Sequence, residues 1–520
     1  MTSSRSCKNL ILLIYLSISL QFQVASSLSS PSQITSNPDA AMLSSTLTPK
    51  IITISETVWR KAASNHSQRI RHLLQPGLTP LEHNINSGKS KRRQQHYIDD
   101  WTALDPVNPI YNFLIEYYGL KGAKGPRRLA RWAPDPKLLW EEHCNEMASS
   151  TTIVSSSSSV EKEQVYKAAM KASHGLGGVL LENANIDDLG GTLHMRGGVP
   201  VPIMVEEGDP QQDTEQPQLH GVLYNPAVFY NRHSPLNNNN NDKDDGKERK
   251  QQLLKTIAPF QWYTSILKQT LNSDPILHCY GLHEWAMQYH PEGADPPPSA
   301  KYQSSLTLRV SRQVINDTVE RKGVRCTHVD ALRFFAPAAG PLNHHGASLQ
   351  RMDQLRLEQK GCVHAHMDLL KIGLKLQGFI DSELMVDILE VALAARKLDV
   401  EASPYDATEY GAGIVPIETN EGRKVYRERQ IGLMQRAEPV RQRLLDAYEV
   451  FMKIAFDESL LLGSDEFVGG RGKKRTPSVV DDNVVMSKSN TGDGPYVAPE
   501  RLAMAEPGGL PWRKNLIEKS

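Results

Sequence analysis

Side chains that could bind a metal or transfer a proton are concentrated between His278 and Asp368. This stretch holds eight of the 17 histidines and three of the five cysteines of the 520-residue chain. The histidines are His278, His283, His290, His328, His344, His345, His364 and His366. Imidazole, thiolate and carboxylate groups are the protein ligands of zinc and iron. The sequence therefore predicts that any active site lies in this stretch.

Three of these histidines, His283, His328 and His364, stand in separate motifs, each with a carboxylate close by in sequence. We predict that they bind zinc or iron, because the same ligand types recur at short spacing in every motif. The motifs contain no Cys-x-x-Cys pair, and no histidine follows His283 at the four-residue spacing of a zinc-protease helix. The alternative interpretation is that these histidines belong to polar networks of the core.

Carboxylates at helical spacing offer a second way to hold metals. His364 and Asp368 are four residues apart and would share one helix face. Glu383, Asp387 and Glu390 would share a face of the next helix. Facing carboxylates and a histidine across a helical bundle could hold two metal ions. Alternatively, the three acidic residues of the second helix form a solvated stripe opposite its apolar face.

Aromatic residues are interleaved with the same motifs. Trp285 follows the His283-Glu284 pair, and Phe334 and Phe335 follow Asp330 within one helical turn or so. Aromatic faces beside a carboxylate could enclose a cationic or planar ligand such as an alkylated purine. The alternative interpretation is that these aromatic side chains are ordinary core residues.

The pattern of apolar residues predicts a mainly α fold with a bundle-like core. Helices are expected over residues 109–118, 127–132, 253–271, 349–359, 362–378, 382–399 and 423–462. The glycine-rich region 178–230 contains short β-like runs, including Val201–Val205, and favours a small strand element. The core domain is expected to span residues 96–460, with insertions near 149–159 and 231–250, and residues 461–520 to form a disordered tail.

The N-terminal region has the composition of a targeting segment. Residues 1–27 combine a short basic start with an apolar stretch and small residues, as signal peptides do. Residues 28–95 are rich in Ser, Thr and Pro at first and are expected to be a transit region and linker. Polar residues interrupt the apolar stretch, so no stable membrane anchor is expected. We predict import into a plastid through the secretory route, with secretion or another organelle as the alternative.

The net charge of the chain excludes a nucleic-acid-binding surface that depends on an overall basic charge. The chain carries 59 Lys+Arg and 59 Asp+Glu residues, so its formal net charge is zero and no global basic field attracts nucleic acid. Any nucleic-acid site must be a local patch. Arg128 and Arg131 belong to one such cluster, together with Lys121, Lys124 and Arg127. This cluster either binds phosphate groups or solvates a loop.

Several strings of the sequence resemble a mostly bacterial family labelled 3-methyladenine DNA glycosylase. The matching strings are Tyr111–Tyr118, Arg128–Trp132, Gly281–Met287, Cys326–Phe335, Pro341–Asn343, Gly361–Leu370, Ala402–Asp406 and Pro416–Thr419. The resemblance covers about residues 96 to 455 apart from the insertions. It implies a DNA-repair N-glycosylase that extrudes a damaged nucleotide from DNA and releases an alkylated purine such as 3-methyladenine.

For the enzyme that the resemblance implies, a carboxylate must orient water or stabilise an oxocarbenium-like sugar. Asp330 is the first candidate, Glu284 the second and Asp368 the third. The expected substrate-binding residues are Trp285, Phe334, Phe335, Arg128 and Arg131. Such an enzyme needs no cofactor, and its partner is damaged DNA. The chain lacks the helix-hairpin-helix pattern of the best-known helical glycosylases, so a helical metal-dependent enzyme of unknown substrate is the alternative.

Overall fold

A computed structural model describes the parts of the chain that carry the predicted site. The described residues are 51–80, 101–135, 138, 167–171, 173, 178–184, 198–202, 220–225, 246–294, 306–321 and 323–455. All of them belong to one compact unit of the chain, residues 49–520. The predictions for residues 1–27, for the insertion at 149–159 and for the tail at 461–520 lie outside the described residues.

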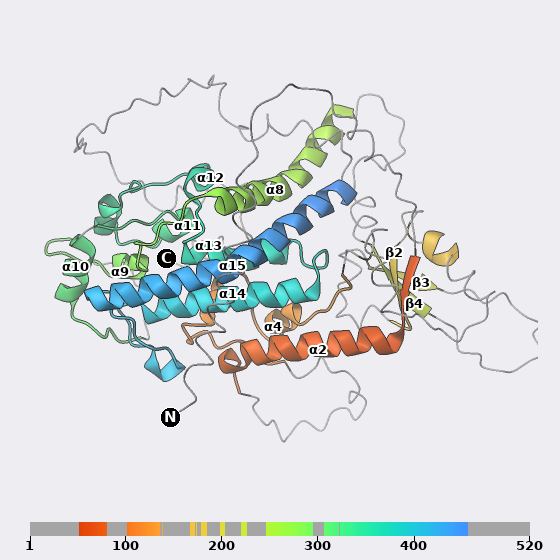
Figure 1. Cartoon of the computed structure of the whole chain (residues 1–520), viewed down its shortest axis with the longest axis horizontal. Coiled ribbons are helices and arrows are strands. Elements are labelled where there is room, and N and C mark those ends of the chain that lie inside the picture. Colours follow the sequence, from red (N-terminus) through yellow and green to blue (C-terminus); the bar gives the residue numbers. More distant parts are fainter. Residues whose placement is uncertain are drawn as a thin grey trace, which may run out of the picture. The chain divides into compact units, whose positions relative to one another are not determined.

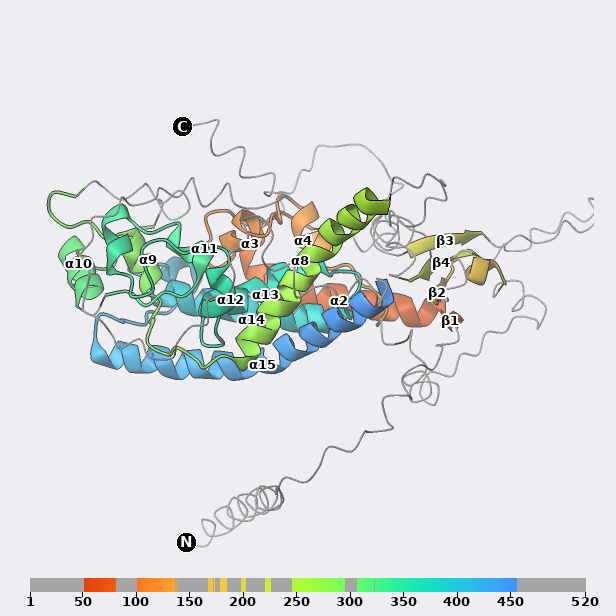
Figure 2. The ribbon, with the colours of Figure 1, turned by 90° about the horizontal axis from the view of Figure 1, so that it is seen from above.

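The centre of the fold is helix α14 (Ser382–Glu401), which packs against α13 (Val363–Lys375), α15 (Asn420–Ala455) and α2 (Glu56–Leu74). Figures 1 and 2 show α13, α14 and α15 side by side, with α8 (Gly246–Asn272) crossing α15. Buried, mostly apolar residues occupy nearly every face of α14 itself, as expected of a helix that other helices enclose. The fold is mainly α, as the sequence predicts.

Helix α2 corrects the prediction that residues 28–95 are a transit region and linker. Ile70 and Leu74 of this helix are fully buried in the main core, and Trp59 is buried near the small sheet. The helical periodicity of the segment is hard to see because His66 occupies one position of its buried stripe. His66 is accommodated there because its Nε2 lies 2.9 Å from the carbonyl oxygen of Leu129.

A small sheet confirms the strand element expected between residues 178 and 230. Its strands are β1 (Ile51–Ile54), β2 (Gly178–Glu182), β3 (Gly198–Pro202) and β4 (His220–Tyr224). They lie in the order β1-β2-β4-β3, with β1 parallel to β2 and the other pairs antiparallel. The sheet is joined to α2 by Trp59, whose Nε1 donates a hydrogen bond to the carbonyl oxygen of Glu182 at 2.8 Å.

Short helices at one end of the long ones carry most of the predicted site. They are α3 (Asn112–Glu116), α4 (Lys124–Leu129), α9 (Leu282–Met287), α10 (Arg312–Glu320), α11 (Val329–Leu332) and α12 (Asp353–Leu357). The described residues also contain the 3-10 turns η2 (Gln75–Gly77), η6 (Pro337–Leu342) and η7 (Thr408–Tyr410). Within the described residues, no helix is both long and apolar enough to cross a membrane.

The predicted boundaries are close for the long helices and poor elsewhere. The helix expected over 349–359 is only α12, and α8 begins at Gly246, inside the expected insertion at 231–250.

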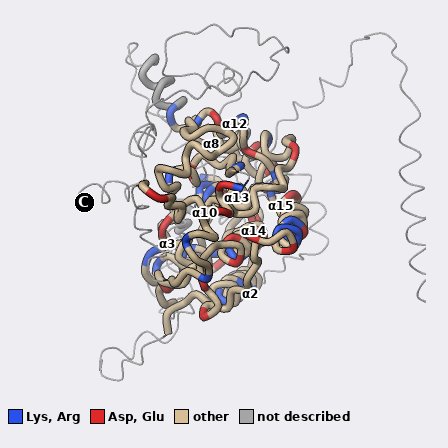
Figure 3. The backbone as a smooth tube through the Cα atoms, turned by 90° about the vertical axis from the view of Figure 1, so that its left-hand side faces the viewer, with Lys and Arg blue, Asp and Glu red and all other residues tan. Residues whose placement is uncertain are grey.

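Charged residues of both signs alternate over the helices that face the viewer in Figure 3, in keeping with the zero net charge. The described surface therefore has local charged patches rather than one charged face.

Candidate active site

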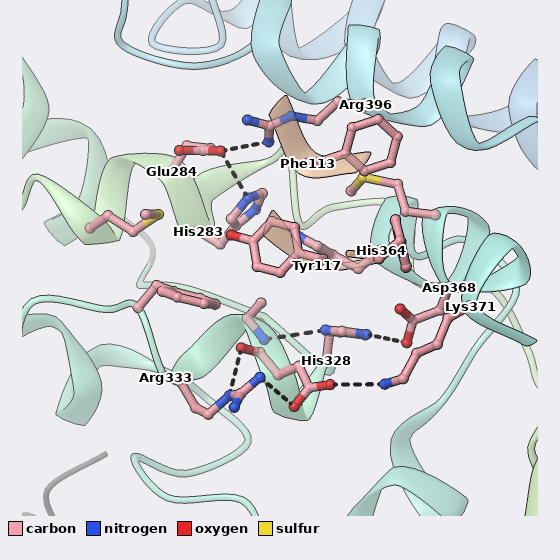
Figure 4. Close-up of a pocket in the computed structure, with 16 residues that line it drawn as sticks. Phe113, Tyr117, His283, Glu284, His328, Arg333, His364, Asp368, Lys371 and Arg396 are labelled. Atoms are coloured by element: carbon pink, nitrogen blue, oxygen red, sulfur yellow. Dashed lines mark hydrogen bonds and ion pairs between the residues drawn. The ribbon is translucent and has the colours of Figure 1, made fainter. Parts of the chain in front are cut away.

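A cavity of about 90 Å³ lies where α3, α9 and α11 meet α13 and α14. Its lining contains the three candidate catalytic carboxylates and the three candidate metal-binding histidines of the stretch between His278 and Asp368: Asp330, Glu284, Asp368, His283, His328 and His364. Figure 4 shows these side chains arriving from different elements. The structure thus brings together residues that are up to 85 positions apart, from His283 to Asp368. Phe334 of the predicted substrate-binding set also lines the cavity.

The other predicted substrate-binding residues do not line the cavity, and their assignment is corrected. Trp285 is fully buried in the core, and its Nε1 donates to the carbonyl oxygen of Ala402 at 2.8 Å. Phe335 is also buried in the core. Arg128 donates to Gln377 at 3.0 Å and so holds the end of α13, whereas Arg131 follows α4. Neither aromatic ring is placed to stack on a ligand in this cavity.

The cavity wall formed by α9 and α14 is a compact network of buried charges. Arg396 Nη1 donates to Glu284 Oε1 at 2.9 Å and to Asp399 Oδ2 at 2.8 Å. His283 Nε2 lies 3.7 Å from Glu284 Oε1 and 3.3 Å from Asp399 Oδ1. All four side chains are buried. Breaking such a network by removing one member is costly, because an uncompensated charge remains buried.

The protonation states of this network follow from its neighbours. Burial acts to lower the pKa of His283, but the Asp399 and Glu284 carboxylates raise it to about 9. Burial acts to raise the pKa of Glu284, but His283 and Arg396 lower it to about 2. Burial likewise acts to raise the pKa of Asp399, but the charge of His283 lowers it. The Asp399 carboxylate is therefore ionised. The network holds two carboxylates, Glu284 and Asp399, and the charge of Arg396 balances only one of them. Without a bound cation, the proton on His283 balances the charge of the other.

His364 lies between the two other imidazoles of the cavity. Its ring packs edge-on against His283, with centroids 4.1 Å apart, and is stacked on His328 at 4.9 Å. Burial, followed by the charge of His283, lowers its pKa well below the usual value, so the imidazole is neutral. Among the described residues, no hydrogen bond to its ring nitrogens is found. A neutral imidazole with an available lone pair is the form that binds metals.

His283, His364 and Asp399 form a group that could hold one metal ion. Their three ligand atoms lie within 4.8 Å of one another. Ligand atoms on one zinc ion are about 3 to 3.5 Å apart, because each lies about 2.0–2.2 Å from the ion. Asp399 Oδ1 is buried and accepts no hydrogen bond within the described part of the chain, although His283 Nε2 is near. A buried carboxylate oxygen in this state is suited to a cation.

His328 belongs to a different arrangement, and its assignment as a metal ligand is corrected. Its Nδ1 accepts a hydrogen bond from the backbone N–H of Ala331 at 3.2 Å, which caps α11. Its Nε2 lies 3.3 Å from Asp368 Oδ2. The two contacts assign the neutral ring a proton on Nε2, which it donates to Asp368. No lone pair of His328 is left for a metal while both bonds are present.

Asp368 is an ionised carboxylate in a largely buried setting. Burial acts to raise its pKa, but Lys371 and His328 lower it below the usual value. The Tyr118 hydroxyl also bonds to Asp368, and burial raises the pKa of Tyr118 well above its usual range. The carboxylate therefore accepts hydrogen bonds from His328 and Tyr118 and is held ionised by the charge of Lys371. A carboxylate held in this way can take a proton from a bound water or substrate.

Asp330 faces two cations at the cavity wall. Its carboxylate lies 2.9 Å from Arg333 Nη2 and 3.5 Å from Lys371 Nζ. Figure 4 shows these two contacts beside the His328–Asp368 pair. Two cations therefore share the charge of the Asp330 carboxylate, whereas Asp368 also accepts a hydrogen bond from His328.

Aromatic rings form another side of the cavity. Tyr117 and Phe334 meet edge to face with ring centroids 5.8 Å apart, and Phe113 and Tyr118 do so at 5.6 Å. All four line the cavity. A flat apolar group could lie against these rings while its polar edge faces Asp368.

Sequence reasoning missed two central residues, Arg396 and Asp399. They are charged residues three positions apart in a segment of α14 that is otherwise almost wholly apolar, and that contrast was an available signal. The acidic residues proposed instead on this helix do not enter the cavity. Asp387 pairs with Arg443 at 2.5 Å, and Glu383 and Glu390 are exposed. The solvated-stripe interpretation is therefore correct for them.

Three free cysteines lie around a second, smaller cavity of about 20 Å³, which shares His283 and His364 with the first. Burial raises the pKa of the Cys326 thiol to about 12 and that of the Cys279 thiol above its usual value. Burial raises the pKa of Cys362 as well. Neutral buried thiols are poor nucleophiles, so these cysteines are structural in their present setting.

Comparison of the chain with protein-family models, with curated proteins and with solved structures finds no match. The family resemblance noted above therefore stays a prediction that rests on the quoted sequence strings. The geometry of the cavity is the evidence from which function can be argued.

Proposed function

We propose that the chain is a metal-dependent hydrolase in which His283, His364 and Asp399 bind one zinc or iron ion. The observation that carries the proposal is the meeting of these three ligand atoms within 4.8 Å at a cavity. Two imidazoles and one carboxylate are a ligand set of both zinc hydrolases and non-haem iron enzymes. Three protein ligands leave at least one coordination position for water or substrate.

The two imidazoles of the group line the cavity, so the open position would face the substrate. A bound ion lowers the pKa of its water and so supplies a nucleophile near neutral pH. Arg396 holds Asp399 and Glu284 in place through two short hydrogen bonds. Asp368, positioned by His328, would be the carboxylate of the cavity that accepts a proton from water during hydrolysis.

Charge balance supports the exchange of a proton for a metal ion. His283 carries a proton because the carboxylates of Asp399 and Glu284 raise its pKa to about 9. A divalent ion between the same groups would replace this proton and satisfy Asp399 Oδ1. Metal binding to such a site is expected to release a proton and to weaken as the pH falls.

The test is metal content with matched variants of the full-length protein. We expect about one zinc or iron ion per chain in the wild type, and a loss of at least about tenfold in affinity for His364→Ala and Asp399→Asn. His366→Ala is the control, because His366 lies on the same helix but outside the cavity. A wild-type protein that binds no divalent ion in reconstitution would contradict the proposal.

A second candidate function is the N-glycosylase that the sequence resemblance implies. It is favoured by the aromatic rings of Tyr117 and Phe334 next to the Asp368 carboxylate, a setting suited to an extruded purine. We propose Asp368, rather than Asp330, as its carboxylate, because Asp330 is paired with two cations. Release of 3-methyladenine from alkylated DNA, measured with and without a chelator, separates the two candidates. Release that survives the chelator favours the glycosylase, and no release discards it.

The plastid location is likewise a proposal. It rests on the composition of residues 1–95, of which only residues 51–80 are described and part of which belongs to the folded unit. A fluorescent fusion of residues 1–50 that is secreted would contradict it.

A further inference from the structure

Positively charged and histidine side chains gather on the surface where five chain segments meet. This Arg325 patch consists of His278, Arg325, His344, His345, Arg356 and Arg427. The segments are joined by backbone bonds: His344 N donates to Val324 O at 2.9 Å, and Val324 N donates to Leu342 O at 3.0 Å. Arg325 Nη1 also lies 3.2 Å from His278 Nε2. The patch is therefore a fixed arrangement and not a run of neighbours in sequence.

The positive charge of the patch is only slightly compensated. Arg325 and Arg427 form no ion pair with any described residue, while Arg356 is 3.2 Å from Asp353. Burial first, and then Arg325, Arg427 and His344, lower the pKa of His278. Burial first, and then the charges of Arg356 and its neighbours in the patch, lower the pKa of His345. No carboxylate contributes to either shift, so the local field is cationic in a chain of zero net charge.

Two arginines of the patch are preorganised. Arg427, on α15, donates to the Tyr280 hydroxyl at 2.7 Å, and its guanidinium lies 5.9 Å from the centre of the Tyr280 ring. Arg325 stands at the rim of the smaller cavity, next to Cys326 and Thr327. Figure 3 shows several Lys and Arg residues on the part of α15 that faces the viewer. A planar guanidinium with fixed direction matches the oxygens of a phosphate group.

We propose that the Arg325 patch binds a phosphate group of a ligand, with Arg325 and Arg427 as its main donors. His278 accepts a hydrogen bond from Arg325 when neutral and adds a positive charge when protonated. His345 adds charge in the same way, and Asp353 reduces the contribution of Arg356. The proposal does not rest on the metal site or on the reaction in the larger cavity. A nucleic-acid backbone and a free phosphate compound offer the same chemical group.

The test measures binding of inorganic phosphate and, separately, of a fluorescent DNA duplex to the full-length protein at pH 6. The variant is Arg325→Gln with Arg427→Gln, and the matched control is Lys61→Gln with Lys255→Gln, which removes two exposed charges on α2 and α8. We expect the first variant to weaken binding about tenfold or more, because it removes two charged hydrogen-bond donors from the patch. The control should change phosphate binding less than about twofold.

The two arms identify the source of the phosphate. Binding of both probes, lost in the arginine variant, assigns the site to phosphate groups in general, and binding of the duplex alone assigns it to a nucleic-acid backbone. Wild-type affinity for the duplex should rise as the pH falls well below 6.5, because the pKa of His278 and of His345 is lowered and both imidazoles gain charge only there. The proposal is overturned if the wild type binds neither probe, or if the lysine control loses as much affinity as the arginine variant. Unchanged circular dichroism of both variants shows that folding is preserved.

Discussion

Helix α13 carries two histidines, the half-buried His364 and the fully buried His366, whose surroundings differ completely. His364 faces the larger cavity, between His283 and His328, with no hydrogen bond found for its ring among the described residues. His366 points toward α15, where Arg441 Nη2 lies 3.3 Å from its Nδ1, and it lines neither of the two cavities described above. Burial lowers the pKa of both imidazoles well below the usual value.

Burial and a shifted pKa therefore do not distinguish a functional histidine from a structural one. The difference lies in the partners. His364 converges with a second imidazole and with a carboxylate from another helix, whereas His366 meets a guanidinium and backbone atoms. A cation can enter the first arrangement, and the positive charge of Arg441 opposes a cation in the second.

The largest expected effect is on stability and concerns two buried arginines. Arg396 belongs to the charge network at the cavity that His364 faces, and Arg441 contacts His366. Arg396→Met should lower the free energy of unfolding by about 3–5 kcal/mol, because it leaves the carboxylates of Glu284 and Asp399 buried without their guanidinium partner. Arg441→Met should cost less, about 1–3 kcal/mol, because Arg441 donates to the Ala365 carbonyl and to a neutral imidazole. Urea denaturation of the metal-free proteins measures both. Equal losses would show that the two regions do not differ in buried charge.

The next effect separates two carboxylates of the cavity. Asp368→Asn should lower the rate of substrate hydrolysis about 100-fold, the usual contribution of a general base, with little change in fold. Asp330→Asn should lower it less than about tenfold, because Arg333 and Lys371 already neutralise that carboxylate. Single-turnover release of base from alkylated DNA is the first assay to use. A larger effect at Asp330 would restore the order expected from the sequence and contradict the role given to Asp368.

A smaller effect is a difference in pH dependence between the two regions. The pKa of His283 is raised to about 9, so its contribution to stability is complete below pH 6.5 and is lost as the pH rises toward 9. The pKa of His366 is lowered, so its contribution is present above pH 6.5 and is lost as the pH falls below it.

Thermal unfolding of the metal-free protein against pH tests this difference. His283→Asn should remove the loss of stability above pH 6.5, on the order of 1 kcal/mol, and His366→Asn should remove the loss below it. A variant pair with the same pH profile would mean that the two imidazoles have the same charge state.

Much of this fold could be predicted from sequence, because long apolar periodic segments such as α13 and α14 form the core that the pattern implies. Helix α2 was missed, because a histidine interrupts its short buried stripe. The clustering of residue types predicted only that any active site lies between His278 and Asp368, and the larger cavity contains His283, His328, Asp330, His364 and Asp368 of that stretch.

The roles within the pocket could not be predicted in the same way. Whether an imidazole is free to bind a cation depends on its hydrogen bonds, and Ala331 N–H and Asp368 occupy both nitrogens of His328. Asp399 lies 31 residues beyond Asp368 in the sequence and enters the site only because α14 packs against α13. Trp285 follows two cavity residues, yet the helical turn of α9 directs its ring into the core.

The most direct test of the central claim is the metal content of His364→Ala and His366→Ala, measured side by side with the wild type after reconstitution with zinc or iron and removal of free ion. The account predicts about one ion per chain in the wild type and in His366→Ala, and less than about one tenth of that in His364→Ala. Equal metal content in all three proteins, or no bound metal in any of them, would contradict the assignment of His283, His364 and Asp399 as a metal site.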